Sequence, residues 1–149
     1  MSTENLSYST NNIELVDLTK YLNLIKNDFP APLDEVVDLK TYSEKMWNFS
    51  ELFLARKGSK LIGFISCYFN DLESKKGYIT SLHVQKNYRR KGVANCMISN
   101  LFLYGKRNGF ISIDVEVQNN NCNAIAFYNK LNFTISSKRE KSMIMTVKI

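Results

Sequence analysis

The chain has 149 residues, of which 44% are hydrophobic and 23% are charged, and this length and composition suit one globular domain with a substantial core. No stretch approaches the roughly 20 apolar residues of a membrane-spanning helix, and the polar start lacks the features of a secretory signal. The three cysteines are odd in number and form no CxxC pair. This pattern argues against a disulfide framework or a metal site and predicts a cytoplasmic protein.

The net charge of +6 makes nucleic-acid binding a hypothesis to consider. The basic residues are spread along the chain in short groups, at 57–60, 75–76, 86–91, 106–107 and 138–141. Most of these groups fall in expected turns, where solvated charge is common. This scattered distribution of the basic residues therefore argues against nucleic acid as a partner.

The first third of the chain predicts one short strand and two helices. Residues 1–11 are expected to be a flexible lead-in, followed by a strand at Ile13–Leu18. Apolar residues at helical spacing predict a helix over Leu18–Phe29, which Pro30 and Pro32 end. A second helix is expected around Leu39–Trp47.

The middle of the chain predicts three strands. Glu51–Arg56 and Leu61–Asn70 are rich in apolar and aromatic residues, and the Lys57–Lys60 turn between them is typical of a hairpin. A central strand follows at Tyr78–Val84.

The last third predicts two helices and three strands. A helix runs to about Asn108 and ends at Gly109. The next expected element is a strand at Phe110–Val117, whose apolar face carries Ile111, Ile113, Val115 and Val117. It is followed by a helix at Asn121–Leu131 with Asn121 as its cap, and by a closing hairpin of Phe133–Ser137 and Met143–Ile149. The whole order indicates a mixed α/β protein in a single domain, residues 1–149.

Between the central strand and the long helix lies a candidate anion-binding loop. Arg89, Arg90 and Lys91 precede Gly92. The first amides of a helix have no acceptor within the helix and carry partial positive charge, so a phosphate oxygen can serve as their acceptor. Gly92 lets a ligand approach the backbone because it has no side chain. By itself such a loop also fits an ordinary solvated basic turn.

Two motifs in the right order carry a family resemblance. Arg89-x-x-Gly92-x-Ala94 resembles the pyrophosphate-binding signature of the GNAT family of N-acetyltransferases, and the segment from Val115 to Phe133 is similar to that family's second motif. There are two departures, since Asn132 stands where glycine is usual and Tyr78 stands where many members have glutamate. Asparagine tolerates the left-handed conformation, so the first departure is mild.

The resemblance implies the GNAT acyl-CoA N-acyltransferase fold: a mainly antiparallel, twisted sheet of about seven strands with four helices and a splayed central strand pair. It implies acetyl-CoA as the acetyl donor, without a metal. The residues that it implies for cofactor binding are Leu82, His83, Val84, Arg89, Arg90, Lys91, Gly92, Val93, Ala94, Asn95, Asn121, Ala124, Phe127 and Tyr128. For Leu82, His83 and Val84 the backbone would do the binding, and the His83 side chain is expected to serve packing.

Glu116 and Tyr128 are the candidate catalytic residues. Amine attack requires a neutral amine, because an alkylammonium of pKa ~10 has no lone pair, so a base must take its proton. Glu116 stands where the ribosomal-protein N-terminal acetyltransferases of the family place a catalytic glutamate, although it also fits a polar residue on an open strand face. Tyr128 stands where the family's general acid lies, and the alternative is a helix aromatic that packs on the core.

The acceptor amine is the least defined part of the prediction. Asp34 and Glu35 form an acidic segment that could attract a cationic amine, although acidic residues are common at helix starts. Protein N termini, lysine, polyamines, amino sugars and drug amines all stay open, as does the choice between monomer and homodimer. The rival hypotheses are an inactive coenzyme A-binding module and a basic nucleic-acid-binding protein.

Overall fold

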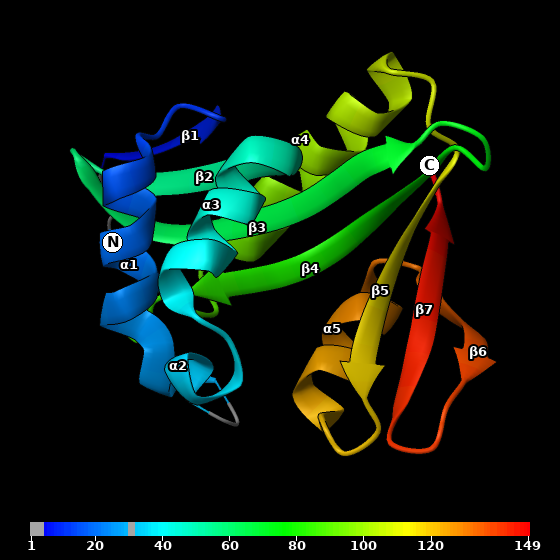
Figure 1. Cartoon of the computed structure of the whole chain (residues 1–149). Coiled ribbons are helices and arrows are strands. Elements are labelled where there is room, and N and C mark those ends of the chain that lie inside the picture. Colours follow the sequence, from blue (N-terminus) through cyan, green and yellow to red (C-terminus); the bar gives the residue numbers. More distant parts are fainter. Residues whose placement is uncertain (1–4, 30–31) are drawn as a thin grey trace. The chain divides into compact units, whose positions relative to one another are not determined.

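The structure, a computed structural model, describes residues 5–29 and 32–149. Figure 1 shows its elements. In chain order they are β1 (Leu6–Thr10), α1 (Leu15–Ile25), η1 (Lys26–Asp28), α2 (Leu33–Val36), α3 (Leu39–Phe49), β2 (Glu51–Lys57), β3 (Lys60–Asp71), β4 (Lys76–Val84), η2 (Lys86–Tyr88), α4 (Val93–Arg107), β5 (Ser112–Gln118), α5 (Cys122–Lys130), β6 (Thr134–Lys138) and β7 (Ser142–Lys148). None of the helices in the described ranges has the length and apolar character needed to span a membrane.

The strands within the described residues form a seven-stranded sheet in the order β1-β2-β3-β4-β5-β7-β6. Strand β5 runs parallel to β4 and antiparallel to β7, and the β1–β2 and β6–β7 pairs are also antiparallel. The predicted mixed, mainly antiparallel sheet with four main helices is therefore confirmed.

The chain divides into two compact units. The first comprises Met1–Ser66 with Ser81–Asn100, and the second comprises Cys67–Thr80 with Leu101–Ile149. Strands β3 and β4 and helix α4 each contribute residues to both units.

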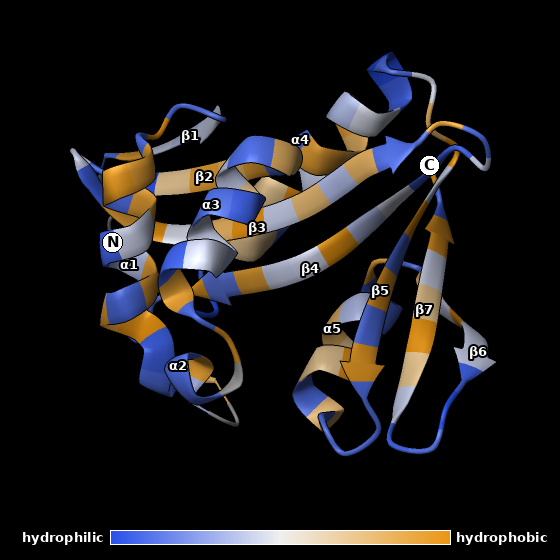
Figure 2. Ribbon diagram, viewed as in Figure 1, coloured by the Kyte–Doolittle hydropathy of each residue, from blue (hydrophilic) through white to orange (hydrophobic). Residues whose placement is uncertain are grey.

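The core of the first unit packs α1 and α3 against β2 and β3. Apolar residues of α1 recur every three or four positions and so lie along one side of the helix. In Figure 2 they are the hydrophobic bands that alternate with hydrophilic ones along the α1 ribbon. The core cluster consists of Leu18, Tyr21, Leu22, Ile25, Met46, Leu52, Leu54 and Phe64. Each fully buried side chain of this size contributes about 1.5–3 kcal/mol.

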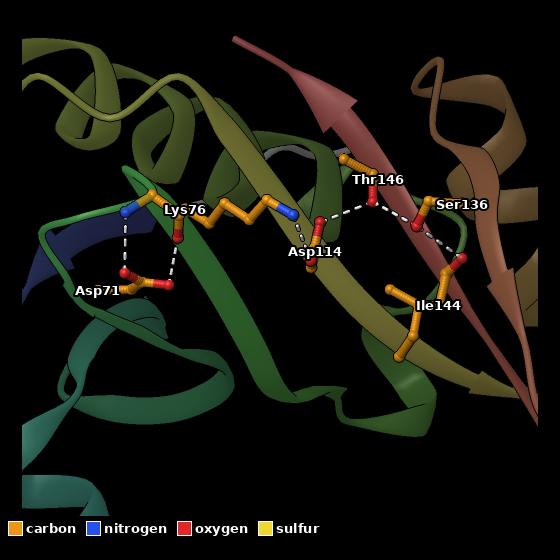
Figure 3. A network of polar contacts seen from close by, with 7 residues as sticks. Asp71, Lys76, Asp114, Ser136, Ile144 and Thr146 are labelled. Atoms are coloured by element: carbon orange, nitrogen blue, oxygen red, sulfur yellow. Dashed lines mark hydrogen bonds and ion pairs between the residues drawn. The ribbon is translucent and has the colours of Figure 1, made fainter.

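The second unit is built on β5 and its neighbours. Ile113, Val115 and Val117 are buried, so by strand alternation Asp114 and Glu116 lie on the opposite face. On that face Lys76 Nζ lies 3.8 Å from Asp114 Oδ2, and Thr146 Oγ1 donates to Asp114 Oδ1 at 2.6 Å. Figure 3 shows how this network continues to the hydroxyl of Ser136.

Three local expectations were wrong. The expected lead-in contains strand β1, which pairs with β2 from Leu6↔Lys57 to Thr10↔Phe53, so pairing with a distant strand fixes a segment with little pattern of its own. Helix α1 begins at Leu15, where the sequence predicted a strand. Ile111, expected on the apolar face of β5, lies before that strand and is 59% exposed.

Candidate active site

The predicted anion-binding loop joins β4 to α4 in the first unit. Gly92 has a φ of +81° and Arg90 a φ of +61°, so two left-handed residues turn the chain just before Val93, where α4 begins. The amide of Cys96 donates to Gly92 O at 3.1 Å, which leaves the amides of the preceding first-turn residues without a helical acceptor.

The space at Gly92 is open on the ligand side. A Cβ built on Gly92 would meet no atom within 4 Å. Open space beside first-turn amides and exposed Arg90 and Lys91 fits an incoming diphosphate group. The geometry of this loop therefore suits the polyphosphate end of coenzyme A.

The Arg89 side chain turns back onto the strand end. Its Nε donates to Val84 O at 2.7 Å, and its Nη2 lies 4.0 Å from Asp28 Oδ2. This guanidinium thus braces the start of the loop, although Arg89 is exposed like Arg90 and Lys91. Of the three cations expected at the phosphate, Arg89 already has partners on the protein.

His83 is a buried residue that packs against α1 and η1. Its Nδ1 lies 3.2 Å from the Tyr21 hydroxyl and its Nε2 lies 3.0 Å from Asp28 Oδ2, and its ring stacks near Phe29. Burial lowers the pKa of the imidazole, against the opposing effect of the Asp28 carboxylate. The side chain therefore ties the end of α1 to β4.

Backbone approaches are close at the same strand end. A Cβ on Gly63 of β3 would lie 3.0 Å from His83 O and 3.3 Å from Met97 Cε. Only a residue without a side chain fits there without displacing a neighbour. Glycine at this position lets β3 and β4 pack closely beneath α4.

In the second unit, Glu116 is surrounded by hydrogen-bond donors. Ser142 Oγ donates to Glu116 Oε2 at 2.5 Å, Arg139 Nη1 donates to the same oxygen at 3.2 Å, and the Tyr78 hydroxyl lies 3.5 Å from Oε1. The Ser142 hydrogen bond, with Arg139 assisting, holds the pKa of Glu116 below its ordinary value. Its side chain is 33% exposed, so the carboxylate is ionised and still reachable from solvent.

Tyr128 is buried on α5. Its ring lies 5.1 Å from the rings of Phe127 and Phe133, and burial raises the pKa of its hydroxyl. Among the described residues no hydrogen-bond partner of that hydroxyl is found. The side chain thus packs as an aromatic and keeps a protonated donor.

The start and end of α5 follow from two asparagines. Asn121 caps the helix, because its Oδ1 accepts from the Ala124 amide at 3.1 Å. After the helix Asn132 has a φ of +70°, the left-handed conformation expected where glycine is usual. Both predictions are confirmed.

The acidic segment at α2 has a local partner. Asp34 forms an ion pair with Lys26 at 3.1 Å, and Glu35 is exposed. The Asp34 carboxylate is therefore partly neutralised within the first unit.

The sequence reasoning missed three neighbours of Glu116. In the sequence, Tyr78 was noted only because it replaces a glutamate common in the family. In the structure its hydroxyl lies against Glu116, and burial together with the Glu116 carboxylate raises the pKa of Tyr78. Arg139 was placed in a basic turn, and neither Arg139 nor Ser142 was linked to Glu116. The register of β5 against β7, with Gln118↔Ser142 and Glu116↔Ile144 as cross-strand pairs, brings this turn close to Glu116. No local sequence pattern predicts that register.

Comparisons with known proteins show which family the chain resembles. The model of the acetyltransferase (GNAT) family matches residues 18–133. The probable N-acetyltransferase san of Drosophila melanogaster is 31% identical over 137 residues, which is 87% of this chain and 72% of that protein. The N-alpha-acetyltransferase MAK3 of Arabidopsis thaliana is 31% identical over 121 residues, 80% of this chain and 63% of that protein.

The fold also recurs in a solved structure. The crystal structure of the ribosomal-protein-S18-alanine N-acetyltransferase from Escherichia coli superposes with a TM-score of 0.77 at 19% identity, over 96% of this chain and 94% of that one. The family match defines a transferase that uses an acyl-coenzyme A donor. The chain belongs to the GNAT family and is an acetyl-CoA-dependent N-acetyltransferase.

Proposed function

We propose that this enzyme acetylates the α-amino group at the N terminus of a polypeptide. Two relatives support this acceptor class by name: MAK3 is an N-alpha-acetyltransferase, and the Escherichia coli enzyme of the same fold modifies an alanine of a ribosomal protein. Within the chain, the support comes from the carboxylate of Glu116.

The lowered pKa of Glu116 makes it a weak base, so the acceptor must be an ammonium that loses its proton readily. A carboxylate that holds protons weakly is a poor acceptor from a strongly basic ammonium. An α-ammonium has a pKa of about 8, against about 10.4 for lysine, so its deprotonation costs about 3 kcal/mol less. The α-amine is also substantially neutral near pH 8. The observation that carries the proposal is the Glu116 carboxylate, which Ser142 and Arg139 hold ionised and which is 33% exposed.

The roles of the remaining residues follow from the same picture. The first-turn amides of α4 beside Gly92 bind the diphosphate of the donor, with Arg90 and Lys91 adding charge and Arg89 bracing the loop. Backbone groups at Leu82–Val84 bind the donor's amides. Glu116 attracts the ammonium and accepts its proton, directly or through water, toward solvent.

Tyr128 acts on the leaving group. The neutral amine attacks the thioester carbonyl, its nitrogen loses a proton to water, and the bond to sulfur breaks to give the amide and a thiolate. Because burial raises the pKa of Tyr128 well above the ~8.5 of a thiol, full proton transfer to the sulfur is uphill by more than about 2 kcal/mol. The hydroxyl therefore stabilises the thiolate as a hydrogen-bond donor, and water supplies the proton.

Matched peptides test the acceptor class. One peptide has a free N terminus and no lysine, and its partner has the same sequence with a blocked N terminus and one added lysine. We expect acetyl transfer to the first, located by tandem mass spectrometry, with kcat/KM rising up to about pH 8 as the α-amine deprotonates. Preferential modification of the lysine would contradict the proposal.

We further propose that the two units form one acetyltransferase domain that works in the cytoplasm as a monomer or homodimer. The family match at residues 18–133 spans residues of both units. The three cysteines, all among the described residues, form no disulfide, which is compatible with a reducing compartment. Analytical ultracentrifugation measures the oligomeric state.

A further inference from the structure

We infer that Arg139 makes this enzyme select polypeptides with an acidic side chain next to the N terminus. The inference rests on the proposed function, since it concerns the amine that reaches Glu116. It assigns a specificity role to one side chain of the turn between β6 and β7.

Arg139 lies directly at the carboxylate that receives the amine. Its Nη1 is 3.2 Å from Glu116 Oε2, the oxygen that also accepts from Ser142. An ammonium bound to Glu116 must therefore either share the carboxylate with the guanidinium or take its place. In both cases the residue that follows the amine is within reach of the long Arg139 side chain, because consecutive Cα atoms are only 3.8 Å apart.

The backbone around Arg139 is anchored. The Arg139 amide donates to Ser142 O at 2.8 Å, and the Asn119 amide donates to Lys141 O at 3.0 Å. The Asn119 side chain adds a bond to Glu140 O at 3.2 Å. The turn is thus hydrogen-bonded internally, between Arg139 and Ser142, and to Asn119 of the β5–α5 loop. The Arg139 backbone therefore stays near Glu116 when the ion pair opens.

The charges favour an exchange of ion pairs. When a substrate ammonium takes the place of Arg139 on Glu116, the guanidinium loses its only carboxylate partner among the described residues. A substrate carboxylate at the second residue restores that partner, so both charges are paired again. Arg139 is 58% exposed and has five N–H donors in a planar fork, a geometry that suits a carboxylate.

The neighbouring charges point the same way. Lys138 and Lys141 flank Arg139 and Glu140 in the turn, and all of these residues are exposed. The turn therefore carries a net charge of +2 from three cations and one anion. An acidic substrate segment would be attracted to it, and a basic one would be repelled.

The test compares kcat/KM for two peptides that differ only in aspartate or asparagine at the second position. We expect the wild-type enzyme to favour aspartate by about fivefold, near the upper end for a solvent-exposed ion pair. The preference shrinks when the salt concentration is raised. In Arg139→Gln the ratio falls to about one, and Arg139→Lys keeps part of the preference.

Lys148→Gln is the matched control, because it also removes one positive charge, this one from β7. Lys148 pairs with Ser112 of β5, away from Glu116, so this variant should keep the fivefold ratio. Arg139→Glu reverses the charge and should shift the preference toward lysine at the second position. This reversal distinguishes a change of specificity from a general loss of activity. A wild-type ratio near one, or an aspartate preference kept in Arg139→Gln, would overturn the inference while leaving the proposed function intact. Acetylation of neither peptide would overturn both.

Discussion

Replacing Tyr128 by phenylalanine separates the packing of this side chain from its hydroxyl. Tyr128 is only 5% exposed, and its ring packs between Phe127 and Phe133. Phenylalanine keeps those ring contacts and removes one oxygen. The Tyr128 carbonyl, which accepts from the amides of Leu131 and Phe133 at 3.0 Å, is unaffected. We therefore expect the variant to fold normally.

The expected loss is in turnover. A hydrogen bond to a charged group contributes about 1.5–3 kcal/mol, and this bond would form only as negative charge develops on the sulfur. Removing it should lower kcat about tenfold to hundredfold with little change in acetyl-CoA affinity. Because burial raises the pKa of Tyr128, the wild-type rate should show no loss from tyrosine ionisation up to pH 9.

The assay follows coenzyme A release with a thiol reagent, and calorimetry measures acetyl-CoA binding to both proteins. Phe127→Leu serves as a control for altered packing on the same helix, because it changes an adjacent ring and keeps the Tyr128 hydroxyl. An unchanged kcat in Tyr128→Phe would remove the hydroxyl from the mechanism. An equal loss of acetyl-CoA affinity would place its role in binding.

Glu116→Gln should lower kcat/KM about tenfold or more at pH 7 and recover part of it at pH 9, where the α-amine is neutral unaided; a pH profile parallel to that of the wild type would reject the base role. Gly92→Ala should cost about 1–2 kcal/mol of stability in urea unfolding, because its φ is +81°, and should also weaken acetyl-CoA binding. Gly58→Ala, at a φ of +60° in the β2–β3 turn, is its control and should lose stability only; equal acetyl-CoA affinity in the two variants would count against the loop assignment. His83 is the sole histidine, so a single NMR titration should give a pKa below the usual 6.5, because burial lowers it. Stability should then be complete above about pH 6.5 and fall as the pH drops through that lower value, and a measured pKa above 6.5 would show that Asp28 outweighs burial.

Most secondary structure could be predicted because its causes are local. The apolar stripe of α1 placed Leu18, Leu22 and Ile25 in the core, and the alternation in β5 placed Ile113 and Val115 there. Where local pattern was weak, prediction failed. Strand β1 lies at the edge of the sheet and has a mostly polar sequence, so it shows no clear apolar pattern. Its pairing with β2 makes it a strand.

The candidate site divides in the same way. Gly92, Asn121 and Asn132 were predictable, since each meets a requirement of its own few residues for a left-handed turn or a helix cap. The surroundings of Glu116 were not predictable, because Ser142, Arg139 and Tyr78 lie 26, 23 and 38 residues away in the sequence.

The sequence by itself determined the family, the glycine turn ahead of α4 and the two catalytic candidates, because motif spacing within one loop and one helix is encoded by adjacent residues. Only the tertiary structure decided which groups control the ionisation of Glu116 and that Arg89 and His83 share Asp28 as a partner. The physical reason is that sheet register and helix packing bring distant residues together. Electrostatic interactions depend on those distances in space, whatever the separation along the chain.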